Sequence, residues 1–219
     1  MTDPVVIETG SEPTGSIIWL HGLGADGHDF EPIVPELRLP DSLSLRFIFP
    51  HAPVQPVTIN GGMAMRAWFD ILDFAVDAVP DVEGIEASCA MLDSLVAAET
   101  ERGVPRDRIL IAGFSQGGVI AIHTALRSPE PLAGLLALST WLPLADRLAG
   151  YPKHADLPVF MAHGQFDPVL PLPMGVAARD AVRKAGLEPA WLDYPMAHGV
   201  CPQEIADISR WLQSVYDDE

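Results

Sequence analysis

A serine set among glycines is the first place where this sequence could do chemistry. The stretch Gly113-Phe114-Ser115-Gln116-Gly117-Gly118 follows an apolar run at residues 109–112 and precedes a segment of helical character at residues 119–126. A strand, a sharp turn and a helix in this order form the setting of a nucleophile elbow, whose glycines leave room for a strained turn that exposes the serine hydroxyl. Ser115 is therefore the candidate nucleophile. The alternative interpretation is a plain glycine turn between a strand and a helix.

A serine hydroxyl is a good nucleophile only when a histidine removes its proton and a carboxylate orients that histidine. In this type of site the acid and then the histidine follow the serine along the chain. His198 lies in the loop 195–199, between the last predicted strand and the last predicted helix, where it can reach over Ser115. We therefore take His198 as the candidate base. Three other histidines fit less well, because they lie within the next helix, in a surface loop or at a strand end: His123, His154 and His163.

Three aspartates compete for the role of the acid. Asp167 comes shortly after the predicted strand at residues 157–161, at the edge where open α/β sheets bind their ligands. Asp193 lies within a predicted strand, so its side chain should point to one face of the sheet rather than over its edge. Asp180 lies beside Arg179 on a predicted helix, which is typical of an exposed helix face. Asp167 is the strongest candidate.

The loop His21-Gly22-Leu23-Gly24-Ala25-Asp26-Gly27 matches Gly-x-Gly-x-x-Gly, so a dinucleotide site has to be weighed. Such a site needs an acidic residue about 20 positions further on, at the end of the next strand, to bind the ribose. Asp41 precedes that strand, so the requirement is not met. A His-Gly loop after an early strand can instead offer a backbone N–H to an oxyanion, together with the residue after the nucleophile. The two donors would be Leu23 and Gln116.

The sequence gives little support for a metal site or for nucleic-acid binding. No His-x-x-x-His, His-Glu-x-x-His or Cys-x-x-Cys spacing occurs, so we expect neither a metal nor another cofactor. His198 and Cys201 alone are too few ligands, and Cys201 is better explained as a small apolar residue at a helix start. The formal charge of −17 repels phosphate backbones and anionic lipid surfaces, so we expect no nucleic-acid partner and no stable membrane association.

Apolar runs of strand length alternate with helical segments along the chain. Strands are predicted at residues 16–20, 43–49, 108–114, 132–138, 157–161 and 189–194, with residues 5–7 pairing antiparallel at an edge. Helices are predicted at residues 84–102, 119–126 and 174–185 and from Pro202 onward. This alternation predicts an α/β fold with a mostly parallel central sheet and helices on both faces. The proline-containing, poorly periodic segment 50–80 is predicted to form loops that decorate the site.

The length of 219 residues fits a single domain, 1–219. With 48% hydrophobic and 20% charged residues, the chain has the composition of a folded protein rather than a disordered one. Its two cysteines suit a reducing compartment, and no apolar run approaches the ~20 residues that span a bilayer. We therefore expect a cytoplasmic protein, and a homodimer stays open.

Several motifs together resemble the carboxylesterase and acyl-protein thioesterase family of α/β-hydrolases, also called phospholipase/carboxylesterases. They are Trp19 to Gly24, Met63-Ala64-Met65 with Trp68-Phe69-Asp70, Gly113 to Gly118, Leu138 to Pro143, His163-Gly164 with Asp167-Pro168, and His198 with Gln203-Glu204. The resemblance covers nearly the whole chain and implies the α/β-hydrolase fold. It also implies a catalytic triad and two oxyanion donors, which are the residues already chosen: Ser115, Asp167 and His198, with Leu23 and Gln116.

These observations predict a serine carboxylesterase that forms an acyl-enzyme on Ser115 and hydrolyses short-to-medium acyl esters. A small-molecule ester or thioester is the expected substrate. The alternatives are an acyl-protein thioesterase or lysophospholipase and, more remotely, a non-catalytic binding protein with the same fold. The resemblance places four large side chains beside Ser115 as candidates for the acyl pocket, although they could instead fill the core under a long loop: Met63, Met65, Trp68 and Trp141.

Overall fold

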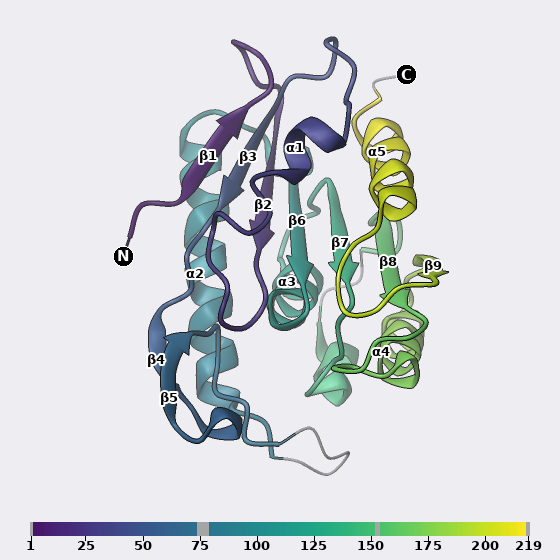
Figure 1. The fold of residues 1–219 in the computed structure, drawn as a ribbon. Coiled ribbons are helices and arrows are strands. Elements are labelled where there is room, and N and C mark those ends of the chain that lie inside the picture. The colour runs from purple at the N-terminus through teal and green to yellow at the C-terminus, as the bar shows by residue number, and fades with distance from the viewer. Residues whose placement is uncertain (1, 74–78, 152–153, 218–219) are drawn as a thin grey trace.

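A seven-stranded sheet forms the centre of the computed structural model, which describes residues 2–73, 79–151 and 154–217 (Figure 1). Its strands lie in the order β1-β3-β2-β6-β7-β8-β9. β1 pairs antiparallel with β3, and the remaining neighbours pair in parallel. The strands are β1 (Val5–Glu8), β2 (Gly15–Leu20), β3 (Leu45–Phe49), β6 (Ile109–Phe114), β7 (Gly134–Leu138), β8 (Val159–Gly164) and β9 (Ala190–Tyr194).

Helices cover both faces of this sheet. In the described residues they are α1 (Ile33–Glu36), α2 (Val82–Glu101), α3 (Gln116–Arg127), α4 (Leu172–Lys184) and α5 (Pro202–Tyr216), with 3₁₀ turns at Thr58–Asn60, Arg106–Arg108 and Ala145–Gly150. α2, α3 and α4 lie on one face, and α1 and α5 lie on the other (Figure 1). The predicted mostly parallel sheet with helices on both faces is confirmed. None of the described helices is long and apolar enough to cross a membrane.

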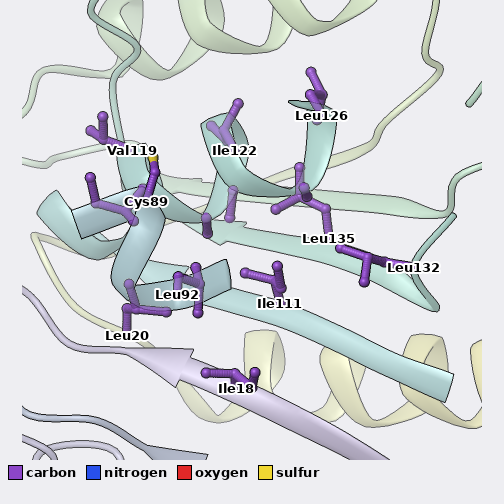
Figure 2. Packing of buried hydrophobic residues seen from close by; sticks show 14 of the residues in the cluster. Ile18, Leu20, Cys89, Leu92, Ile111, Val119, Ile122, Leu126, Leu132 and Leu135 are labelled. Atoms are coloured by element: carbon purple, nitrogen blue, oxygen red, sulfur yellow. The ribbon is translucent and has the colours of Figure 1, made fainter. Parts of the chain in front are cut away.

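Two apolar layers hold the helices on the sheet, because alternate residues of each strand point to opposite faces. In β2, Ile18 and Leu20 belong to the layer under α2, α3 and α4, whereas Ile17 and Trp19 belong to the layer under α1 and α5. Figure 2 shows the first layer, where residues of three strands meet side chains of α2 and α3: Ile18, Leu20, Ile111, Leu135, Cys89, Leu92, Val119 and Ile122. Burial on both faces explains why these strands read as continuous apolar runs.

The carboxyl ends of the parallel strands lie along one edge of the sheet, and the candidate site residues follow them. β2 ends just before His21, β6 ends just before Ser115, and β8 ends three residues before Asp167. β9 ends four residues before His198. Ligands bind at this edge in open parallel sheets, so the order of strands is what gathers residues from distant parts of the sequence.

The segment 50–80 departs from its prediction as loops alone. β4 (Val54–Val57) and β5 (Met63–Arg66) form an antiparallel hairpin around the 3₁₀ turn at Thr58–Asn60. In the sequence, Pro56 argues against a strand, because proline is found in sheets mainly on edge strands. β4 is such an edge strand, since it pairs with β5 in a two-stranded hairpin. Residues 74–78 of this segment lie outside the described residues. Elsewhere the predicted strands are found: β1 starts at the predicted residue, the other starts shift by one or two residues, and β8 ends three residues later than predicted.

Candidate active site

Ser115 has a backbone conformation that few residues adopt. Its φ is 52° and its ψ is −119°, between the end of β6 and the first turn of α3. The flanking glycines allow this turn, because a Cβ on Gly113 would lie 2.3 Å from the carbonyl oxygen of Gly117, and one on Gly117 would lie 2.6 Å from that of His21. Any larger residue at either position would push the turn apart. The predicted strand, sharp turn and helix are therefore all present.

The end of the neighbouring strand β7 holds the turn from outside. The backbone N–H of Ser115 donates to the carbonyl of Leu138 at 2.9 Å, and the Thr140 hydroxyl donates to the Ser115 carbonyl at 2.8 Å. Both partners belong to β7 or to the residues directly after it. A strained backbone conformation persists only where its surroundings fix it, and these two hydrogen bonds supply part of that support.

His198 lies between the serine and an aspartate. Its Nε2 is 3.0 Å from the Ser115 hydroxyl, and its Nδ1 is 2.6 Å from Oδ2 of Asp167. A carboxylate can only accept, so Nδ1 carries the proton and Nε2 is left free to accept from the hydroxyl. The ring of Phe114 packs against the imidazole, with ring centroids 4.8 Å apart. The histidine is thus oriented to take a proton from Ser115.

The carboxylate of Asp167 is fixed on both oxygens. Oδ1 accepts the backbone N–H groups of Val169 and Leu170 at 2.9 and 2.8 Å, which leaves Oδ2 for His198. The rival Asp193 is exposed and accepts from the Gln165 side chain, so it lies outside this chain of hydrogen bonds. The other rival, Asp180, pairs with an arginine on the exposed face of α4, as the sequence indicates.

The three rejected histidines have other partners. His123 is buried in α3 and lies within hydrogen-bond distance of the Pro143 carbonyl and the Tyr151 hydroxyl. His154 is half-buried rather than solvated, because its Nε2 lies 2.8 Å from the carbonyl of Ser128. His163 is buried at the end of β8, and its Nε2 donates to the carbonyl of Leu170 at 2.7 Å. Burial lowers the pKa of His163, so it stays neutral beside the triad acid.

The loop after β2 lies directly against the elbow. A Cβ on Gly22 would come within 3.5 Å of the Ser115 Cβ. Gly24 donates its backbone N–H to the carbonyl of Arg66 at 2.8 Å, which anchors the loop to the β4–β5 hairpin. Within the described part of the chain, the backbone N–H groups of Leu23 and Gln116 donate to no protein acceptor. Both are therefore available to an oxyanion formed at Ser115.

His21 fixes the shape of this loop. Its Nε2 accepts the backbone N–H of Ala52 at 3.1 Å, so its Nδ1 carries the proton and donates to the Gly22 carbonyl at 2.7 Å. Burial lowers the pKa of His21 to about 4, which keeps the ring neutral and both bonds intact at physiological pH. The buried Trp68 indole adds a bond to the His21 carbonyl at 2.8 Å. Sequence analysis treated His21 only as part of a glycine loop and missed this positioning role.

The side chain of Gln116 joins the elbow to the segment after β5. Its Oε1 accepts the backbone N–H of Trp68 at 2.9 Å, and its Nε2 donates to the carbonyl of Phe69 at 2.7 Å. Gln116 and Trp68 are both buried, and the Ser88 hydroxyl of α2 donates to the Trp68 carbonyl. Gln116, the predicted oxyanion donor, is therefore fixed by its own side chain.

The four candidate pocket residues lie in different environments. Trp68 is 1% exposed and supports the loops from beneath, so it does not offer the surface to substrate that was expected. Met63 is 64% exposed near the turn of the β4–β5 hairpin, and Met65 lies about 3.8 Å from the Cβ position of Gly24. Trp141 lines a cavity of about 310 Å³ together with Phe69, Leu142 and Met174. Only this last residue borders a cavity of substrate size.

No group of histidine, cysteine, aspartate or glutamate side chains in the described ranges is arranged to hold a metal ion. Cys201 is the residue before α5 and is half-buried, in agreement with its predicted place at a helix start. Cys89 is buried in the layer between α2 and the sheet, where burial raises the pKa of its thiol to about 11. Neither thiol lies in the chain of hydrogen bonds at Ser115.

Comparison with known proteins decides the family. The model of the family described as Phospholipase/Carboxylesterase matches residues 1–216. The chain belongs to this family. It is a serine hydrolase with the α/β-hydrolase fold, as the sequence motifs predict.

Relatives of this hydrolase span nearly its whole length. Acyl-protein thioesterase 1 of Mycosarcoma maydis is 38% identical, over 94% of this chain and 93% of that protein. Acyl-protein thioesterase 1 of Cryptococcus neoformans is 40% identical, over 91% of each. The crystal structure of SOBER1 from Arabidopsis thaliana has a TM-score of 0.87 and 29% identity, covering 93% of this chain and 99% of that one.

Glu204 is a buried carboxyl group that sequence analysis noted only as part of a motif. It lies in the first turn of α5, six residues after His198, and is fully buried. Burial raises the pKa of Glu204 to about 8, with a smaller rise from Asp207 and an opposing effect of the Cys201 backbone N–H. Among the described residues, neither carboxyl oxygen of Glu204 has a partner in hydrogen-bond geometry. No capping box signals this group in the sequence, because Cys201 rather than serine or threonine precedes α5.

We expect Gln116→Ala to lower the free energy of unfolding by about 2–4 kcal/mol, because it leaves the Trp68 N–H and the Phe69 carbonyl buried without partners. It should also lower kcat for ester hydrolysis at least tenfold, since the oxyanion donor loses its support. Gln213→Ala is the matched control, because Gln213 bonds only within α5. Urea unfolding and steady-state kinetics provide the two measurements. Equal stability and equal kcat in the two variants would show that the Gln116 side chain does not support the site.

Glu204 should make the protein less stable as pH rises. The unfolded chain loses the Glu204 proton near pH 4.5, whereas the folded chain keeps it up to about pH 8, so the free energy of unfolding should fall between these values. Glu204→Gln should remove this contribution and stabilise the protein more at pH 8 than at pH 5. Urea unfolding of wild type, Glu204→Gln and the exposed control Glu188→Gln across that range tests it. A pH-independent difference between wild type and Glu204→Gln would contradict the expectation.

Proposed function

We propose that the protein hydrolyses acyl esters and thioesters through a covalent acyl-enzyme on Ser115. The observation that carries this proposal is the continuous chain from Asp167 through His198 to Ser115, with distances of 2.6 and 3.0 Å. Asp167 orients the imidazole, His198 acts as base and acid, and Ser115 is the nucleophile. The family match and the relatives named as acyl-protein thioesterases support the same chemistry.

The geometry accounts for each step. His198 Nε2 accepts the proton as Ser115 Oγ attacks the substrate carbonyl, and the charge on the carbonyl oxygen meets the backbone N–H groups of Leu23 and Gln116. His198 then passes the proton to the departing alcohol or thiol, and the acyl group stays on the serine. In the second half, His198 activates a water molecule that releases the acid. These steps need only side chains and backbone groups of this chain.

The curated relatives are named acyl-protein thioesterases, and the cavity beside Trp141 suits the acyl chain of a thioester. Its lining is mainly apolar, and its volume of about 310 Å³ is at the small end of ligand sites. Phe69 connects it to the elbow, because its carbonyl accepts from Gln116. We propose short-to-medium acyl chains as the preferred length and a protein-borne or small-molecule thioester or ester as the substrate.

Two other functions remain as alternatives. A lysophospholipase would use the same residues on a lipid ester, and only its substrate would differ. A non-catalytic binding protein would have an unreactive serine. The hydrogen-bond distance between Ser115 and His198 argues against this alternative, because it allows His198 to activate the hydroxyl. Labelling with a fluorophosphonate separates an active serine from an idle one, because the reagent requires an activated hydroxyl.

Ser115→Ala should abolish ester and thioester hydrolysis, by at least about 10³-fold, without unfolding the protein. Asp167→Asn should cause a similar loss, because the imidazole loses the acceptor that fixes its tautomer. Asp193→Asn is the matched control and should retain activity, since its carboxylate bonds only to Gln165 among the described residues. Steady-state kinetics on a chromogenic ester, with circular dichroism to verify folding, give the answer. An active Ser115→Ala protein would refute the mechanism.

Chain length should show where the acyl group binds. Each buried methylene contributes about 0.8 kcal/mol, so kcat/KM should rise about fourfold per methylene until the cavity beside Trp141 is full. Met174→Ala enlarges this cavity and should move the optimum to longer chains, whereas Met91→Ala on α2 should not. A graded series of acyl esters measures the optimum, with triolein emulsion as comparison. A maximum on triolein, or an unchanged optimum in Met174→Ala, would contradict this assignment.

A further inference from the structure

A second cavity, of about 360 Å³, opens on the other side of the active site. His198 forms part of its wall, together with Phe114 at the end of β6 and Val200 of the following loop. The opposite wall comes from Phe30 and Ile33, at and before α1. α1 and the start of the chain's last helix, α5, lie on the same side of the sheet (Figure 1). We call this space the α1–α5 cavity.

In the proposed reaction, the acyl half and the leaving-group half of the substrate lie in different cavities. His198 must hand its proton to the departing alcohol or thiol, so that group has to lie within hydrogen-bond distance of Nε2. The α1–α5 cavity has His198 in its wall, whereas the cavity beside Trp141 does not, and the two share no lining residue. With the acyl chain in the Trp141 cavity, the leaving group extends into the α1–α5 cavity.

The charge of the α1–α5 cavity is one-sided. Asp29 and Glu36, whose side chains stay largely accessible to solvent, line it, and neither lysine nor arginine does. Aspartates also line the Trp141 cavity, so the α1–α5 cavity is distinguished by having His198 in the same wall as its carboxylates. Within the described ranges, neither carboxylate is paired with a cation, whereas the nearby Glu31 is paired with His28. Partial burial and the neighbouring Asp26 raise the pKa of Asp29, which reflects the cost of a negative charge there without a partner. A positive charge entering the cavity would lower that cost.

The aromatic rings of the α1–α5 cavity favour the same kind of ligand. Phe30 and Phe114 lie in its wall with ring centroids 5.4 Å apart, and a cation near an aromatic face is attracted by the ring quadrupole. Arg38 lines a neighbouring hollow that shares Glu36 and Ile205 with this cavity but does not include His198. The cavity that contains His198 is therefore lined by carboxylates and aromatic rings.

We propose that the α1–α5 cavity binds the alcohol or thiol half of the substrate and selects leaving groups that carry a positive charge. This inference rests on the proposed hydrolysis at Ser115 and adds to it the charge of the preferred substrate. A lysine or arginine close to an acylated cysteine and a quaternary ammonium on a small thiol share this chemistry. The acyl chain plays no part in the selection, because it lies in the other cavity.

Three butyryl thioesters of similar size test the proposal: a cationic one of thiocholine, a neutral one of 3,3-dimethylbutanethiol and an anionic one of mercaptopropanesulfonate. Wild type should give the highest kcat/KM for the cation and the lowest for the anion. The double variant Asp29→Asn, Glu36→Gln should lose about tenfold of the ratio between cation and neutral substrate. The ratio is the readout because both substrates react at the same Ser115 and His198, so a general change in turnover cancels from it.

A matched control separates local selection from the overall charge of −17. Asp3→Asn with Glu12→Gln removes the same charge at exposed positions outside both cavities, and it should keep the wild-type ratio. Equal ratios in wild type and both double variants would overturn the inference while turnover of the neutral thioester upholds the proposed function. No turnover of any thioester would instead refute the proposed function, and the inference with it.

A second arm identifies the source of the positive charge. Peptides with one butyrylated cysteine flanked by lysines, or by glutamates in the matched peptide, replace the small thiols. A preference for the lysine peptide that Asp29→Asn, Glu36→Gln removes points to an acylated protein segment. A preference confined to thiocholine points to a small quaternary ammonium ester. A preference in neither series overturns the proposal.

Discussion

The backbone turn at Ser115 is the constraint on which the rest of the site depends. A serine with φ of 52° and ψ of −119° is strained, by about 1–3 kcal/mol, and packing must hold it in place. Without a side chain, Gly113 lets β6 lie close to the start of α3, and Gly117 lets α3 lie close to the end of β2. Leu138 and Thr140 bond the serine backbone from the next strand. The elbow therefore exists only because the parallel sheet around it is complete.

From this turn, the support of the site passes outward through backbone hydrogen bonds. Gln116 bonds the chain at Trp68 and Phe69, and Trp68 in turn bonds the carbonyl of His21. The hairpin strand β5 accepts from Gly24. Loops from three separate parts of the sequence thus meet in one network of bonds. Such a network would keep the proposed oxyanion donors in position before the substrate arrives, which is the condition for electrostatic stabilisation of a transition state.

Two cavities lie beside the proposed catalytic groups. The cavity beside Trp141 is lined mainly by apolar side chains of the segment before α2, the segment after β7 and α4, although Asp70, Asp73 and Asp81 also line it. The α1–α5 cavity combines aromatic rings with two carboxylates and has His198 in its wall. An ester or thioester has the same asymmetry, with an apolar acyl chain on one side of the carbonyl and a polar group on the other. The direction of substrate binding that we propose rests on this match.

The sequence by itself determined the order of the elements and the nucleophile, because buried parallel strands read as apolar runs and an elbow needs glycines at fixed spacing around Ser115. It also indicated Asp167 and His198 through their places after strands. The tertiary structure decided that Asp167 bonds His198 and that His198 lies within hydrogen-bond distance of Ser115. It also decided that Trp68 is buried beneath the loops and that β4 pairs with β5. Only the tertiary structure revealed the two hydrogen bonds of the Gln116 side chain, the burial of Glu204 and the two cavities. These features arise from contacts between segments tens of residues apart, and local periodicity carries no record of such contacts.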